Sequence, residues 1–202
     1  MHSRSRFQSV ALCVACIALA GSAFAESFHI TPGEPNLVQF VSKAPLETFK
    51  GKTRSVSGSV QLDPNAIGDS ITVRVAVDLA SLDTGIDIRN RHMRENHLET
   101  EKYPTAVFQG GKIHNATATR LQPGDTLRFE LDGVLSLHGI DKPLRAPIEL
   151  TLESVGGALQ VRVAASFQVR LSDHGIDRPK FLVIKLDEVQ RVTVELIAKA
   201  GE

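Results

Sequence analysis

Apolar and polar residues alternate along most of this chain with a period of two, the pattern of a β-strand buried on one face and exposed on the other. The longest alternating row covers residues 127–137, where every second residue is apolar or glycine. Further rows cover residues 28–30, 37–41, 56–62, 71–79, 106–108, 148–152, 161–169 and 192–196. The pattern predicts an all-β protein with about eight or nine antiparallel strands.

Such strands must close or stack to cover their edges. A single barrel of about eight strands fits the alternation, and so does a sandwich of two sheets. The inward rows are rich in Val, Ala, Leu and Gly and poor in bulky aromatic residues, which favours an internal cavity. Gly133, in the middle of the longest row, indicates either barrel curvature or the close approach of another group.

Residues 87–98 interrupt the alternation and predict one short helical insert. Asp87 can cap this helix, and Pro104 ends the segment because Tyr103 before it is pushed towards extended geometry. The helix has too few apolar residues for a wide apolar face, so we expect it to lie over a barrel mouth or rim.

The polar side chains of this insert have two interpretations. In the first, Arg89, Arg91, His92, Arg94 and His97 form a polar gate around an apolar cavity. In the second, they pair with neighbouring acidic residues and only solvate the helix. Residue types alone favour the second interpretation, whereas the insertion of a helix into a sheet favours the first.

Residues 1–25 have the features of a secretory signal peptide, so we expect the mature domain, residues 26–202, in the periplasm. Arg4 and Arg6 precede an apolar run that ends before the small-x-small site Ala23-Phe24-Ala25. Lipid attachment at Cys16 is the less favoured alternative. The chain's two cysteines both lie in this leader, so the mature protein is expected to lack disulfides and thiolate metal sites.

The composition limits the classes of binding partner that we expect. Without Arg4 and Arg6 the chain has 21 basic and 23 acidic side chains, so no strong field attracts nucleic acid or anionic lipid. The chain has no tryptophan and one tyrosine, Tyr103, which favours a soluble barrel over an outer-membrane barrel. We expect no membrane span, and the oligomeric state stays open, a dimer included.

Catalytic motifs are hard to find, and we expect a protein that is not an enzyme and holds no metal. Neither a nucleophile elbow, a phosphate-binding glycine loop nor a zinc-binding helix motif occurs in the sequence. His138 and His174 each precede a glycine, and either could act with Asp141 or Asp173 as a general base. A histidine at a turn more often binds backbone groups.

Three stretches resemble the YceI-like family of exported proteins, across essentially the whole mature chain. They are LDTG at 82–85 with RNRHMR at 89–94 and YPTAVF at 103–108, LDGVLSLHGIDKP at 131–143, and LSDHGI at 171–176. The third stretch departs from the family pattern, because Leu171 and His174 stand where many relatives have an arginine and an aromatic residue. We therefore expect a differently shaped loop there, which affects ligand identity more than fold.

The resemblance implies a lipocalin-like antiparallel barrel with an apolar channel, and some family members bind polyisoprenoid lipids or isoprenoid quinones. No cofactor is implied beyond such a bound lipid or quinone. The candidate channel wall consists of Phe40, Leu62, Val75, Val77, Phe108, Phe129, Leu131, Leu135, Phe167 and Val169. The candidate rim and head-group residues are Arg89, His92, Arg94 and Tyr103.

Three functional hypotheses follow. The first is an exported carrier, store or protective binder of a long-chain isoprenoid lipid. The second is an interaction module with a filled barrel, whose rim binds a membrane redox or stress-response partner. The third is an enzyme that uses His138 or His174. The volume of the barrel interior separates the first hypothesis from the second.

Overall fold

The computed structural model describes Ala25 to Gly201, apart from residues 44–47, 69, 179 and 182–183. The predicted leader, residues 1–25, therefore lies outside the described residues except for Ala25. Within the described part of the chain, no helix has the length and apolar character needed to cross a membrane.

The described residues form one large antiparallel sheet and one small hairpin. The large sheet contains β1 (Glu26–Ile30), β2 (Leu37–Lys43), β3 (Thr48–Thr53), β4 (Val56–Leu62), β5 (Ser70–Asp78), β6 (Thr105–His114), β7 (Thr126–Leu137), β8 (Ile140–Val155), β9 (Ala158–Arg170) and β12 (Val189–Ala200). The hairpin contains β10 (Lys180–Phe181) and β11 (Ile184–Lys185).

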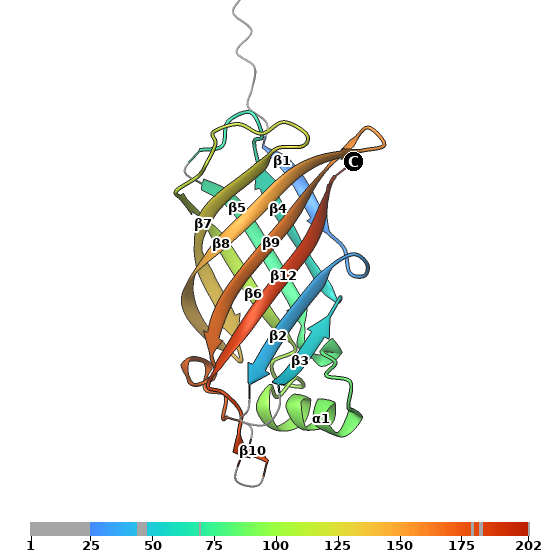
Figure 1. The fold of residues 1–202 in the computed structure, drawn as a ribbon, viewed down its shortest axis with the longest axis vertical. Helices are drawn as coiled ribbons and strands as arrows, with labels where there is room; N and C mark the ends of the chain where they lie inside the picture. Colours follow the sequence, from blue (N-terminus) through green and yellow to red (C-terminus); the bar gives the residue numbers. More distant parts are fainter. Residues whose placement is uncertain (1–24, 44–47, 69, 179, 182–183, 202) are drawn as a thin grey trace, which may run out of the picture.

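The large sheet closes into a barrel because β1 pairs with β4 on one side and with β12 on the other. β2 also pairs with β12, and β3 pairs with β2, so β1 and β2 occupy one position of the barrel and β3 and β4 the next. The ten described strands thus fill eight positions, which confirms the predicted barrel and rules out the sandwich. Figure 1 shows the tilted strands of this barrel.

A short helical segment projects from the barrel between β5 and β6, after the 3₁₀ turn Leu79–Ser81, and lies at one end of the barrel (Figure 1). It consists of α1 (Asp87–His92) followed directly by a π-helical turn, Met93–His97. We call residues 87–97 the lid helix. Its position confirms the predicted insert, but Asp87 is not the cap: Ile86 occupies that position, and no side chain caps the helix.

The opposite end of the barrel is filled by side chains. Two loops cross this end and bind each other, since Ile67 N donates to Thr119 O (2.8 Å) and Leu121 N donates to Pro64 O (2.7 Å). Ile67 and Leu121 are thereby buried among apolar residues of the strand ends. We call this group the apolar plug; it consists of Leu62, Ile67, Ile113, Leu121, Leu127 and Leu152.

The barrel wall has a seam between β8 and β9. Pairing of these strands runs from Val155–Ala158 to Ile148–Ala165 and stops there. Residues 140–147 of β8 continue to pair with β7, while residues 166–170 of β9 continue to pair with β12. Leu171–His174, a 3₁₀ turn, follows β9 and contacts β8 at the base of the seam.

Candidate functional site

The half of the barrel next to the lid helix contains an apolar cavity of about 840 Å³. This volume lies within the range of about 300–1,000 Å³ that is typical of small-molecule sites. Apolar side chains on the inward faces of the strands make up most of the wall, and the lid helix covers one end. The interaction-module hypothesis requires a barrel filled along its whole length, and this half of the barrel is not filled.

Nine of the ten predicted wall residues line this cavity. They are Phe40, Val75, Val77, Phe108, Phe129, Leu131, Leu135, Phe167 and Val169. Leu62 was placed wrongly: it is the last residue of β4 and packs in the apolar plug instead. The inward-facing residues of β4 extend past the cavity into the filled end of the barrel. Alternation alone does not show where along a strand the cavity ends. Whether the nine residues bind a ligand stays a prediction.

The ring of Phe108 explains the glycine in the longest strand. Phe108 on β6 lies against the space that a Cβ would occupy at Gly133 on β7, and a Cβ at Gly110 would lie 2.7 Å from Phe108 Cζ. Gly133 therefore accommodates the close approach of a ring from the same chain. Because the ring lies flat against the wall, it takes less volume from the cavity.

Two of the four predicted rim residues line the cavity. Arg89 and His92 do so, together with their neighbours Met93 and His97 on the lid helix. The other two lie outside the cavity lining: Arg94 Nη1 donates to Ala80 O (3.4 Å), and the centroids of the Tyr103 and His138 rings lie 4.5 Å apart. Spacing along a short helix did not show which side faces the barrel.

A buried asparagine anchors the lid helix to the barrel. Asn90 Oδ1 accepts hydrogen bonds from Thr84 N (2.8 Å) and Thr84 Oγ1 (2.6 Å), and Asn90 Nδ2 donates to Asp83 Oδ1 (2.7 Å). Asp83 in turn exchanges backbone hydrogen bonds of 2.9 Å with Lys52 on β3. Hydrogen bonds from Gly85 N and Asn90 hold the pKa of Asp83 below its usual value. Sequence analysis missed this role of Asn90.

Arg89 joins the lid helix to the cavity mouth. Its Nε donates to Thr84 Oγ1 (2.8 Å) and its Nη2 to Thr84 O (2.6 Å). Its Cζ lies 4.5 Å from the centroid of the Phe49 ring, a cation–π distance. Arg89 therefore does more than solvate the helix: it packs on a cavity-lining ring and fixes the loop before the helix.

Ile86 and Ile88, at the start of the lid helix, line the cavity mouth and also face solvent. Their exposed fractions are 47% and 65%. Large apolar side chains in such a position extend the apolar surface of the cavity to the outside of the barrel.

Three polar atoms at the cavity wall lack a hydrogen-bond partner among the described residues. They are Ser42 Oγ, Gln190 Oε1 and His97 Nδ1, and each is buried. Burial lowers the pKa of His97 despite its hydrogen bond to the Asp177 backbone. Sequence analysis missed Ser42 and Gln190, although each continues an inward apolar row: Val38 and Phe40 lead to Ser42, and Val192 leads back to Gln190.

His138 and His174 bind backbone carbonyl groups at the base of the seam. His138 Nδ1 lies 3.1 Å from His174 O, and His174 Nδ1 lies 3.1 Å from Ile140 O. His174 is buried, and neighbouring Leu171 lines the cavity. These contacts fit the structural role of turn histidines better than general base catalysis. Leu171 and His174 thus connect the end of β9 to β8.

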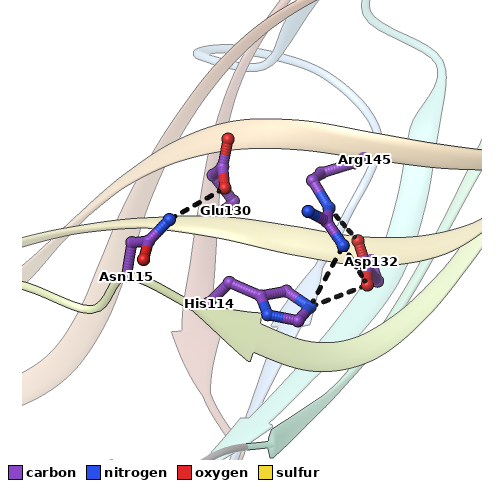
Figure 2. A network of polar contacts seen from close by, with 5 residues as sticks. All are labelled: His114, Asn115, Glu130, Asp132 and Arg145. Atoms are coloured by element: carbon purple, nitrogen blue, oxygen red, sulfur yellow. Dashed lines mark hydrogen bonds and ion pairs between the residues drawn. The ribbon is translucent and has the colours of Figure 1, made fainter.

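A polar network lies on the other face of the wall. Figure 2 shows His114, Asp132 and Arg145, which come from β6, β7 and β8. Arg145 donates from Nε to Asp132 Oδ1 (2.5 Å) and from Nη2 to Asp132 Oδ2 (3.0 Å), and His114 Nε2 lies 2.7 Å from Asp132 Oδ2. Arg145, and to a lesser degree His114, holds the pKa of Asp132 well below its usual range. The network joins three strands outside the cavity.

Comparison with known proteins identifies the family. The model of the YceI-like domain matches residues 28–198, which is nearly the whole barrel. The chain belongs to the YceI-like family. A UPF0312 protein of Photorhabdus laumondii is 28% identical over 159 residues, covering 76% of this chain and 78% of the relative. A UPF0312 protein of Vibrio vulnificus is 32% identical over 110 residues, about half of each chain.

Solved structures share the fold of this YceI-like protein. A polyisoprenoid-binding domain from Saccharophagus degradans, described as implicated in plant cell wall breakdown, superposes with a TM-score of 0.66 at 17% identity, covering 88% of this chain and 99% of that domain. BcnA of Burkholderia cenocepacia gives a TM-score of 0.63 at 19% identity, covering 81% of this chain and 96% of BcnA. At these identities the likeness establishes the fold.

Proposed function

We propose that this protein is an exported, periplasmic binding protein that holds an isoprenoid-type lipid, a polyisoprenoid or an isoprenoid quinone, in the barrel cavity. Binding there serves transport, storage or protection of the lipid under stress, and no catalysis is involved. The leader-like residues 1–25 support the location. The apolar cavity under the lid helix is the observation that carries the proposal.

The wall suits a long apolar chain. Burial of one isoprene unit of five carbons contributes roughly 3–4 kcal/mol at about 0.8 kcal/mol per carbon. A hydrogen bond to a polar head group adds a net of about 1 kcal/mol. Affinity therefore comes mainly from the chain inside the barrel, and polar groups near the mouth choose the head group. The solved polyisoprenoid-binding domain of the same fold supports this class of ligand.

Native mass spectrometry of the protein isolated from its own periplasm tests the proposal. We expect a co-purifying lipid that is released on unfolding and has the mass of an isoprenoid compound. Val77→Trp, which places a large ring in the cavity wall, is expected to co-purify with much less lipid. Arg91→Trp adds the same ring at an exposed position of the lid helix and should leave the lipid content unchanged. Protein that carries no lipid and takes up none after delipidation would refute the proposal.

A further inference from the structure

Ser42 and Gln190 both line the cavity, on the paired strands β2 and β12. These strands pair in antiparallel register from Leu37–Glu195 to Val41–Arg191, and each of the two polar residues is next in its strand to a member of the last pair. Ser42 also pairs with Phe49 on β3, and Gln190 with Val169 on β9. All four side chains line the cavity, so the two polar residues lie within a band of apolar wall that crosses four strands.

The polar atoms of this pair are both buried and unpaired. Ser42 is 1% exposed and Gln190 is 7% exposed. Gln190 Nε2 donates to Asp187 O (2.6 Å), and this contact fixes the amide so that Oε1 is the free end. Neither Ser42 Oγ nor Gln190 Oε1 has a hydrogen-bond partner among the described residues. Buried polar groups in native proteins nearly always have partners, so two unpaired atoms at a cavity wall mark a place where a ligand can bind.

The chemistry of the two atoms specifies the missing partner. Gln190 Oε1 can only accept a hydrogen bond, whereas the Ser42 hydroxyl can donate one. A ligand hydroxyl satisfies both, because it donates to Gln190 Oε1 and accepts from Ser42 Oγ. An ether or quinone oxygen only accepts, so it leaves Gln190 Oε1 unpaired.

A third buried acceptor lines the same cavity. His97 hydrogen-bonds to the Asp177 backbone, and its Nδ1 has no partner among the described residues. In a neutral imidazole that donates through one nitrogen, the other nitrogen accepts. His97 Nδ1 is thus a third polar atom of the cavity wall that a ligand can bind.

We propose that Ser42 and Gln190 form a polar subsite in the cavity that selects lipids carrying a hydroxyl group at their polar end. The inference rests on the proposed function, which it refines from isoprenoid-type lipid to a lipid with a hydrogen-bond donor. A lipid hydroxyl gives both Ser42 Oγ and Gln190 Oε1 a hydrogen-bond partner. A head group that only accepts leaves Gln190 Oε1 unpaired.

Isothermal titration calorimetry with two matched probes, farnesol and farnesyl methyl ether, tests the inference on delipidated full-length mature protein. The wild type is expected to bind farnesol about fivefold more tightly than the ether, since each hydrogen bond nets roughly a fivefold gain and the ether keeps one of the two. In Ser42→Ala with Gln190→Leu, the ratio should fall to about one, because farnesol loses both hydrogen bonds and the ether loses the one from Ser42, which weakens ether binding about fivefold.

Control variants distinguish failure of the subsite from failure of the proposed function. Ser57→Ala with Gln168→Leu makes the same chemical changes at exposed strand positions and should keep the wild-type ratio. Ser42→Ala alone removes a hydroxyl that has no partner among the described residues, so it should fold normally, weaken both probes about fivefold and keep the ratio between them. A ratio near one in the wild type, or a fivefold ratio retained in the double variant, would overturn the subsite and leave the proposed function standing. Failure of both probes to bind would overturn the proposed function and the subsite together.

Discussion

The phenyl ring of Phe40 on β2 lies over Gly51, its cross-strand partner on β3, in the space that a side chain at Gly51 would need. Phe40 lines the cavity, so the missing side chain at Gly51 lets this ring lie back against the wall. The nearest contacts of a Cβ at Gly51 would all be atoms of the Phe40 ring. The pair therefore sets the width of the cavity beside the Ser42–Gln190 subsite.

Gly51→Ala is expected to turn the Phe40 ring towards the cavity. Farnesol affinity should fall about tenfold, and the free energy of unfolding should fall by about 1–3 kcal/mol, the usual cost of overpacking. Calorimetric titration and thermal unfolding measure the two effects. Gly68→Ala is the matched control, because no atom lies within 4 Å of a Cβ at Gly68. Unchanged affinity in Gly51→Ala would show that the Phe40 ring does not limit the cavity.

Asn90→Ala is expected to loosen the lid helix. It leaves Thr84 N and Asp83 Oδ1 without their contacts to the Asn90 side chain, a local cost of about 1–3 kcal/mol. Bound farnesol should dissociate about tenfold faster, as measured by stopped-flow transfer to lipid vesicles. Asn96→Ala, an exposed position on the same helix, should leave the rate unchanged. Lower stability with an unaltered dissociation rate would separate Asn90 from ligand release.

The contribution of Asp132 to stability should depend on pH. Its pKa is lower in the folded protein than the ordinary aspartate value near 3.9, so its contacts stabilise the fold fully above about pH 5. As pH falls below that value, the unfolded chain takes up the proton first and the contribution is lost. The difference in Tm between wild type and Asp132→Asn should therefore be constant near neutral pH and shrink between about pH 5 and pH 2.

A variant of Arg145 tests the coupling between Asp132 and Arg145 in the same network. Arg145→Met removes the main partner of Asp132, so its stability difference should follow the same pH course. The double variant should lose little more than either single variant, because both remove one shared contact. Fully additive losses would contradict a direct coupling between the two side chains. High salt should reduce the effect, since the pair is partly exposed.

Ser42→Ala should raise the stability of the lipid-free protein. The substitution removes a buried hydroxyl that has no hydrogen-bond partner among the described residues and leaves an apolar wall. A gain of about 1 kcal/mol corresponds to a rise in Tm of roughly 2–4 °C for a domain of this size. Differential scanning calorimetry measures the rise. A drop in Tm would mean that the Ser42 hydroxyl supports the fold rather than a ligand.

The barrel could be predicted from the sequence because its inward rows are long and regular. β3 was missed, since its residues 48–53 alternate Phe49, Gly51 and Thr53 with lysines and carry little apolar signal. β8 was predicted as residues 148–152 but begins at Ile140, because Pro143 and Pro147 disguise its first half. Proline disfavours a strand that pairs on both sides, yet this half pairs with β7 alone.

The site was predicted less completely than the fold. Alternation shows which face of a strand points inward, and so it placed residues such as Phe108 and Phe167 at the cavity. It does not show where along the barrel the interior is filled, which is why Leu62 was assigned to the channel. The pattern does not indicate Ser42 and Gln190 as cavity residues, because a polar residue in an inward row ends the apolar pattern on which the prediction depends.

The seam in the wall also bears on strand pairing between molecules. Below Ile148 and Ala165, β8 and β9 each have an edge that does not pair with the other, and unpaired edges invite strands from other molecules. Pro143 and Pro147 interrupt the hydrogen-bonding capacity of the β8 edge, and Lys142 and Arg145 add charge to it. The β8 edge of the seam is thus a poor template for edge-to-edge pairing with another molecule.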